Sequence, residues 1–131
     1  MTFCVCISLF AAYAIQRLRF CGAASLGIAI FLSYLVPPTI LFIPLATIIF
    51  QLNLWDTQWA LILSYPTFLI PFCTWLLMGY FKSIPKELEE CAMIDGASRF
   101  QIFCRIILPV SLPGVFSAMI FAFILSWNEF L

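Results

Sequence analysis

Long apolar runs, broken at few points by charge, dominate the pattern of the chain. Three intervals contain no charged residue: 20–55, 57–81 and 106–128, with 36, 25 and 23 positions. A helix needs roughly 20 apolar residues to cross a bilayer, so each interval is long enough for a membrane-spanning helix. Residues 1–16 form a fourth apolar stretch that is too short for a full crossing.

Prolines divide the longest of these intervals. An unbroken helix over 20–55 would be far longer than the bilayer is thick, and Pro37-Pro38 and Pro44 are expected to break or kink it. The expected order is a partial span at 1–16, a kinked span at 21–50, an external loop at 51–58, a span at 59–81, a cytoplasmic loop at 82–109 and a span at 110–131.

Composition supports a membrane protein. The 131 residues are 65% hydrophobic and only 9% charged, with a mean hydropathy of +1.14, whereas soluble domains carry about 25% charged residues. The predicted fold class is therefore all-α, a polytopic transmembrane helical bundle in contact with the lipid bilayer. Six basic residues balance six acidic ones, so the basic excess typical of nucleic-acid binding is absent and no nucleic-acid partner is expected.

The few charged residues indicate how the chain is oriented in the membrane. If the segments alternate across the membrane, all six basic residues lie on one side, and the opposite loop holds only Asp56. Basic residues favour the cytoplasmic side of a membrane protein. The stretch from Lys82 to Arg105, with eight of the twelve charged residues, is therefore expected in the cytoplasm.

The sequence of this charged stretch predicts a short helix and indicates where that helix begins and ends. Pro85 suits the first helical position, and three glutamates follow where the positive end of the helix dipole favours them. Gly96 can end the helix in the left-handed conformation. Leu88, Cys91 and Ala92 would share one face.

A second short helix is expected from Ser98, whose spacing to Gln101 matches a capping box. Its apolar residues recur at helical spacing: Phe100, Phe103, Cys104 and Ile107. Pro109 would end or turn this helix. The two helices could dock into a groove of a partner, or their apolar stripe could pack on their own bundle, and the two interpretations are compatible.

The same stretch carries a specific motif. Glu90-Cys91-Ala92 is followed by three residues and Gly96, then by nine residues and Ile106-Ile107-Leu108-Pro109. This segment resembles the EAA loop of the membrane permease subunits of bacterial binding-protein-dependent ABC importers, written E-A-A-x3-G-x9-I-x-L-P. Asp95-Gly96-Ala97 fits the usual D-G-A extension. Cys91 replaces the first alanine, a change between small residues.

Softer matches extend the resemblance over nearly the whole chain, to the maltose-type and glycerol-phosphate-type permeases of the carbohydrate-importing branch. The matching segments are Ala11-Ala12-Tyr13-Ala14, Arg17-Leu18-Arg19-Phe20, Pro37-Pro38, Gly79-Tyr80-Phe81, Ile84 to Glu90, Phe121-Ala122-Phe123 and Trp127-Asn128-Glu129-Phe130. Such permeases have more spans than this chain holds, so we expect a fragment of the transmembrane domain, truncated at both ends.

The resemblance implies a transporter subunit of the bacterial inner membrane that is not itself an enzyme and holds no cofactor. Its partners would be cytoplasmic ABC ATPase subunits, a second permease subunit and an extracytoplasmic solute-binding protein, and its cargo a sugar or related carbohydrate. The loop would act as a coupling helix inserted into a cleft of the ATPase. By resemblance, the coupling residues are Glu90, Cys91, Ala92, Asp95, Gly96 and Ala97.

Polar residues at membrane depth or at its rim are candidates for the cargo path. They are Thr39, Ser64, Thr67, Asn128 and Glu129. Hydroxyl and amide groups also form hydrogen bonds between helices, and Glu129 could simply lie at the outer interface of the membrane. Both interpretations stay open for these residues.

Two other function classes compete with an importer subunit. A secondary carrier or channel often places ionisable groups inside its spans for proton or ion coupling, whereas the intervals above contain no charged residue. A structural membrane subunit without ATPase coupling is the second alternative. The chain has no histidine and no phosphate-binding glycine loop, and its six cysteines lack C-x-x-C spacing, so we expect no catalytic site, metal site or disulfide.

Overall fold

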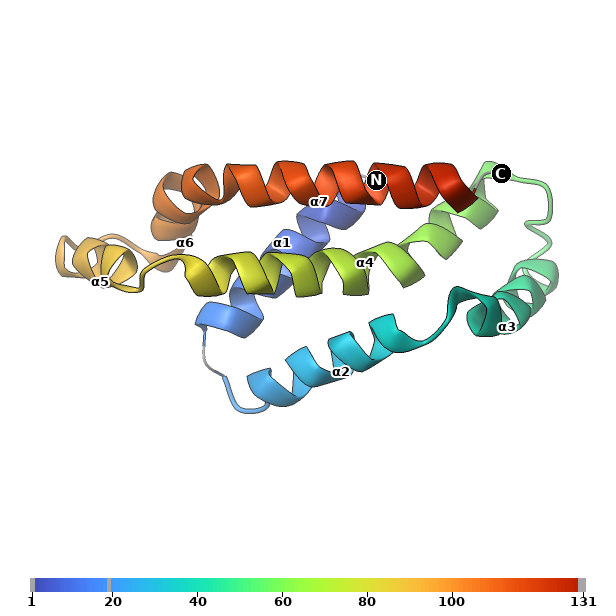
Figure 1. The fold of residues 1–131 in the computed structure, drawn as a ribbon, viewed down its shortest axis with the longest axis horizontal. Coiled ribbons are helices and arrows are strands. Elements are labelled where there is room, and N and C mark those ends of the chain that lie inside the picture. Colours follow the sequence, from blue (N-terminus) through green and yellow to red (C-terminus); the bar gives the residue numbers. More distant parts are fainter. Residues whose placement is uncertain (1, 19, 130–131) are drawn as a thin grey trace.

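The computed structural model describes residues 2–18 and 20–129, residue 129 by its backbone alone. The elements are α1 (Thr2–Arg17), α2 (Ala23–Leu35), α3 (Pro38–Gln51), α4 (Gln58–Ser83), α5 (Glu87–Ile94), α6 (Arg99–Ile102), the π-helical η1 (Phe103–Ile107) and α7 (Leu108–Glu129). No strand occurs among the described residues, and the predicted all-α fold is confirmed (Figure 1).

Two helices are long and apolar enough to cross a membrane. They are α4, with 26 residues, and the continuous helix Arg99–Asn128, with 30. α2 and α3 pass the same test only as a pair, and the pair is bent by 91°. The described part of the chain therefore holds two candidate spans, or three if the bent pair is one broken span, while α1 is a shorter apolar helix.

The bend between α2 and α3 follows from two adjacent prolines. Pro37 and Pro38 have no N–H, so the carbonyls of Ser33 and Tyr34 find no donor four residues ahead. α2 consequently ends at Leu35. The other prolines at membrane depth stay inside helices: Pro44, Pro66, Pro71 and Pro113.

One long helix leads from the charged stretch into the last candidate span. α6, η1 and α7 follow one another without a break, so the expectation that Pro109 ends or turns the helix is wrong. The π-helical turn ends at Ile107, two residues before Pro109. In a regular α-helix the ring of Pro109 would meet the carbonyl of Arg105, which lies within this π turn.

The π turn also changes which side chains face inward. Phe103 and Ile107 of the predicted stripe are buried, but Phe100 and Cys104 are exposed and Ile102 is buried instead. Hydrogen bonds from residue i to i+5 widen the turn, so the spacing of an α-helix does not hold across this segment.

α1, α4 and α7 pack together to form the core (Figure 1). Their buried residues recur every three or four positions: Cys4, Ser8 and Ala12 on α1, Leu69, Cys73, Leu77 and Phe81 on α4, and Ser111, Val115, Ala118 and Ala122 on α7. Many of these residues are small, which lets helix backbones approach closely in a membrane. The hydroxyl of Ser8 also donates across the contact to the carbonyl of Ile70 (3.3 Å).

The charged segments gather at one end of the bundle, which we call the charged end. α5 and α6 lie there beside the C-terminal ends of α1 and α4, whereas the α3–α4 connection lies at the opposite end (Figure 1). Five of the basic residues belong to this end: Arg17, Lys82, Lys86, Arg99 and Arg105. The charged end therefore collects most of the polar surface that the chain possesses.

Gly114 brings α4 and α7 into close contact. A Cβ atom at this position would lie 2.6 Å from Cγ of the Tyr80 ring, so only a glycine leaves room for that ring. The hydroxyl of Tyr80 donates to the carbonyl of Val110, one turn earlier on α7 (3.4 Å).

Gly114→Ala is therefore expected to weaken the contact between α4 and α7. Overpacking of this kind costs about 1–3 kcal/mol. Gly79→Ala is the matched control, because nothing lies within 4 Å of the Cβ position of that helical glycine. Thermal unfolding of the full-length protein in detergent measures both variants, and equal melting temperatures would contradict the close packing.

Candidate coupling site

α5 ends in a hydrogen-bonded turn centred on Gly96. This residue has a φ of 83°, in the left-handed region that favours glycine. Its N–H donates to the carbonyl of Met93 (3.1 Å), and the N–H of Ala97 donates to the carbonyl of Ala92 (3.0 Å). These two bonds define a Schellman motif. The prediction that Gly96 ends the helix in this conformation is confirmed.

The next helix begins directly after this turn. The N–H of Ser98 donates to Oε1 of Gln101 (2.9 Å), and the N–H of Gln101 donates to Oγ of Ser98 (3.3 Å). The predicted capping box is thus confirmed. Because the stop signal of α5 and the start signal of α6 are contiguous, hydrogen bonds hold the backbone through the whole connection.

The start of α5 lies two residues later than predicted. Pro85 is predicted at the first helical position, but the helix begins at Glu87 with Lys86 as its N-cap. Ile84 caps the end of α4, since its N–H donates to the carbonyl of Phe81 (3.2 Å). Three residues, 84–86, therefore separate α4 from the start of α5.

The buried face of α5 also differs from the prediction. Glu89 and Ala92 are buried, whereas Leu88 and Cys91 are exposed. Ala92 joins the apolar core as expected. A buried carboxylate, however, is stable only beside a compensating cation or donor, and at Glu89 that cation is Arg17.

Arg17, the last residue of α1, contacts two other helix ends. Its Nη1 lies 3.0 Å from Oε1 of Glu89, an ion pair whose atoms are close without being aligned as a hydrogen bond. Its Nη2 donates to the carbonyls of Phe81 (2.7 Å) and Ile84 (2.8 Å). The carbonyl of Phe81 also accepts from the N–H of Ile84, and because Pro85 has no N–H, no donor four residues ahead competes with the guanidinium. We call this set of contacts the Arg17 clamp.

The clamp lies in an apolar environment. The side chains of Arg17 and Glu89 are only 3% and 6% exposed. One turn earlier on α1, the ring of Tyr13 packs on Phe81 (6.4 Å between centroids) and on Phe103 (4.8 Å). Exclusion of water strengthens the attraction between the two charges and raises the cost of separating them.

The opposite side of α5 carries exposed residues of mixed character. Glu90 and Cys91 are neighbours in the chain and Ile94 lies one turn further along. These three residues form what we call the outer face of α5, on which Ile94 is 84% exposed. Asp95 is exposed beside them, and Phe100 at the start of the next helix is 70% exposed. Large exposed apolar side chains rimmed by charge are typical of interaction surfaces.

The structure divides the six predicted coupling residues between two environments. Glu90, Cys91, Asp95 and Gly96 are exposed, Ala92 is buried, and Ala97 is half-buried against the core. The first group is available for a partner. The second group anchors the turn to the bundle.

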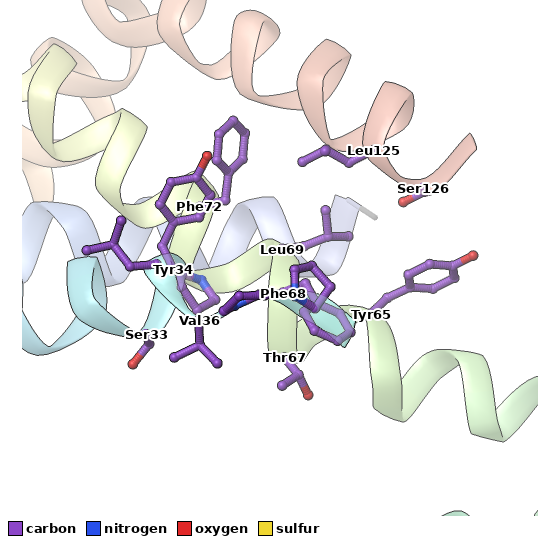
Figure 2. A pocket seen from close by; sticks show the side chains of 14 residues that line it. Ser33, Tyr34, Val36, Tyr65, Thr67, Phe68, Leu69, Phe72, Leu125 and Ser126 are labelled. Atoms are coloured by element: carbon purple, nitrogen blue, oxygen red, sulfur yellow. The ribbon is translucent and has the colours of Figure 1, made fainter. Parts of the chain in front are cut away.

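A cavity of about 410 Å³ lies at the break between α2 and α3, against α4 and the last turns of α7 (Figure 2). Aromatic rings line much of it, and Tyr65 and Thr67 of α4 are also among its lining residues. From α7, the Oγ of Ser126 is buried and has no hydrogen-bond partner among the described residues. The carbonyls of Ser33 and Tyr34, deprived of helical donors, lie at the same break.

The remaining path candidates occupy different places. Thr39 and Ser64 line a neighbouring cavity of about 520 Å³ between α3 and α4, but the hydroxyl of Ser64 already donates to the carbonyl of Ala60 (2.8 Å). Asn128 is exposed near the end of α7, apart from both cavities. The side chain of Glu129 lies outside the described residues.

A family model described as "Binding-protein-dependent transport system inner membrane component" matches residues 5–131. The chain belongs to this family. The charged stretch and the apolar helices both lie within the matched residues.

Curated relatives of the chain include proteins named as permeases of ABC transporters or transport systems. The chain is 37% identical to the inner membrane ABC transporter permease YcjP of Escherichia coli, 41% to the sulfoquinovosyl glycerol permease SmoH of Agrobacterium fabrum and 39% to the trehalose/maltose permease MalG of Thermococcus litoralis. Each match covers 97% of this chain and 45%, 45% and 46% of the relative. The chain thus spans under half the length of these relatives.

Sequence reasoning misses three residues of the two sites. Arg17 and Glu89 carry only a weak signal, an arginine at the end of an apolar helix and one glutamate among three. Their contact joins segments far apart in the chain, which no local pattern reports. Ser126 resembles any other serine in an apolar run, and its lack of a partner is visible only once α2, α4 and α7 are packed.

Gly96→Ala is expected to destabilise the turn by about 1–2 kcal/mol, because a side chain with a Cβ atom disfavours the left-handed conformation. Nothing lies within 4 Å of the Cβ position, so the cost is one of conformation and not of space. Gly96→Asn is the matched control, since asparagine tolerates this conformation better. Melting temperatures report the difference, and an alanine variant at least as stable as the asparagine variant would contradict it.

Proposed function

We propose that the chain forms part of a multi-pass permease subunit of an ATP-driven importer in the bacterial inner membrane, with its charged end in the cytoplasm. The outer face of α5 carries this proposal. It presents Glu90 and Ile94 on a helix whose end is held by Gly96 and Ser98. A surface held in this way can transmit force without bending.

The partner at this surface is a cytoplasmic ABC ATPase subunit. Glu90 forms a charge-assisted bond with a basic residue of the ATPase, and Ile94 and Phe100 enter an apolar cleft. ATP hydrolysis takes place on that separate chain. Closure of the ATPase dimer moves α5, and the membrane helices then switch access between the two sides.

The cargo is a sugar or related carbohydrate, delivered by an extracytoplasmic solute-binding protein and passed between this subunit and a second permease subunit. The names of the relatives support this class, and so does the cavity of Figure 2, where aromatic rings and hydroxyl groups occur together. Thr67 and Ser126 are the residues that we assign to the path. Thr39, Ser64 and Asn128 are weaker candidates, and Glu129 stays a sequence prediction.

A secondary carrier is less well supported. The intervals 57–81 and 106–128 contain no charged residue, so they offer no group for coupling to protons or ions. A purely structural subunit would not require a rigid turn that displays an exposed isoleucine. Energy supplied by an ATPase at the charged end agrees with both observations.

Glu90→Lys tests the docking surface. Loss of a charge-assisted bond costs roughly 1.5–3 kcal/mol, so binding to the ATPase should weaken about 10- to 150-fold. Copurification of the full-length permease with its ATPase measures the effect. Asp56→Lys, the same charge change at the opposite end of the bundle, is the control.

Equal recovery of the ATPase with Glu90→Lys and with the wild type would contradict docking through the outer face of α5. A weakening of the same size in both substituted proteins would contradict it as well, because the effect would then depend on net charge alone.

Ser126→Val tests the path. Loss of one hydrogen bond to a cargo hydroxyl costs about 0.5–1.5 kcal/mol, which should raise the half-saturating cargo concentration about 2- to 12-fold while ATPase binding is unchanged. Ser117→Val is the control, because the Ser117 hydroxyl is exposed and already donates to the carbonyl of Pro113 (2.9 Å). Transport assays in which both variants behave alike would exclude Ser126 from the path.

A further inference from the structure

We propose that Arg17 and Glu89 are a positioning pair that joins the α5 turn to α1, so that movement of α5 by a partner displaces the membrane helices. This inference rests on the proposed function. It assigns a coupling role to two buried residues that lie outside the docking surface.

α5 is attached to the bundle by its backbone, by the buried Ala92 and by the Arg17–Glu89 contact. Its backbone continues into α4 through Pro85 and Lys86 and into α6 through the Gly96 turn. Its other two glutamates, Glu87 and Glu90, are exposed. The Arg17–Glu89 contact is the one ion pair among the described residues, and it is the side-chain link from α5 to α1.

The second terminal nitrogen of the Arg17 guanidinium is hydrogen-bonded to the end of α4. The Nη2 atom of Arg17 donates to two carbonyls at the end of α4, at 2.7 and 2.8 Å, where the helix dipole favours positive charge. The guanidinium is planar and rigid, so its Nη1 and Nη2 atoms cannot move independently of each other. A displacement of Glu89 therefore acts on α1 and α4 together.

The route continues from the clamp into the core. α1 packs along α4 and also contacts α7, and its buried residues Ser8 and Ala12 lie in those contacts. In this way the short α5 is linked to each of the long apolar helices.

Stabilisation of α5 alone does not explain the burial of Glu89. Glu87 and Glu90 already place negative charge in the first turn, where it favours the helix dipole. Burial of a third carboxylate removes it from water, which makes a buried pair weak evidence for stability, whereas such pairs fix the geometry of the elements they join in some proteins. Fixing the orientation of α5 is such a use.

The test uses the full-length permease with its ATPase, its second permease subunit and its solute-binding protein, reconstituted in lipid vesicles. Glu89→Gln keeps the size of the side chain but removes its charge. ATPase binding should stay within twofold of wild type, because the outer face of α5 is unchanged. Cargo transported per ATP hydrolysed should fall at least fivefold, because α5 then moves without carrying α1.

Glu87→Gln is the matched control, since it removes the same charge from the same helix at an exposed position. It should leave cargo transported per ATP within twofold of wild type. Arg17→Lys keeps the charge but loses the planar fork, and an intermediate ratio is expected. If Glu89→Gln does not accumulate in the membrane, Glu89→Asp takes its place, because the shorter side chain keeps the charge and withdraws it from Arg17.

Normal transport per ATP in the Glu89 variants would overturn the positioning role. A loss of ATPase binding and transport in proportion to a lower protein level, with the ratio unchanged, would overturn it equally, since the pair would then only stabilise the fold. Failure of the proposed function has a different signature, because the wild-type permease itself would neither bind an ATPase nor transport cargo in an ATP-dependent way.

Discussion

The rest of the structure depends on how a single guanidinium is placed. Arg17 joins the end of α1 to two carbonyls at the end of α4 and to the carboxylate of Glu89 on α5. Pro85, four residues after Phe81, has no N–H, so the Phe81 carbonyl accepts from the N–H of Ile84 and from the guanidinium and from no helical donor at position 85. Without this cation, the carboxylate of Glu89 would be buried beside the carbonyls at the end of α4 with no positive charge to compensate it.

Two neighbouring glutamates consequently have different environments. Glu89 points into the bundle and is almost fully buried, while Glu90 points outward beside the exposed Ile94. The Schellman motif at Gly96 and the capping box at Ser98 hold the helix between these two faces in one orientation. One face of the short helix is thus attached to the bundle and the other is presented to a partner, an arrangement suited to a mechanical connection.

Features that depend on local chemistry could be predicted from the sequence, and features that depend on distant contacts could not. The apolar runs indicate a helical membrane protein, and Gly96 and Ser98 mark their turn, because backbone conformation and capping are decided by nearby residues. The burial of Glu89 requires Arg17, which comes from another helix. The π turn before Pro109 invalidates α-helical spacing, so the stripe through Phe100 and Cys104 is predicted wrongly.

The central claim, that α5 and α1 move as one body, is tested most directly by a distance between one cysteine on each helix. Cys6 on α1 is exposed and free, and Leu88→Cys adds an exposed cysteine on α5 outside its outer face. Both can carry spin labels once the other exposed cysteines, Cys21, Cys91 and Cys104 among them, are replaced by alanine. Double electron–electron resonance on the full-length transporter with and without ATP then reports their separation. We predict one narrow distance distribution that is the same in both states, and an ATP-dependent shift in the wild-type protein would contradict the account.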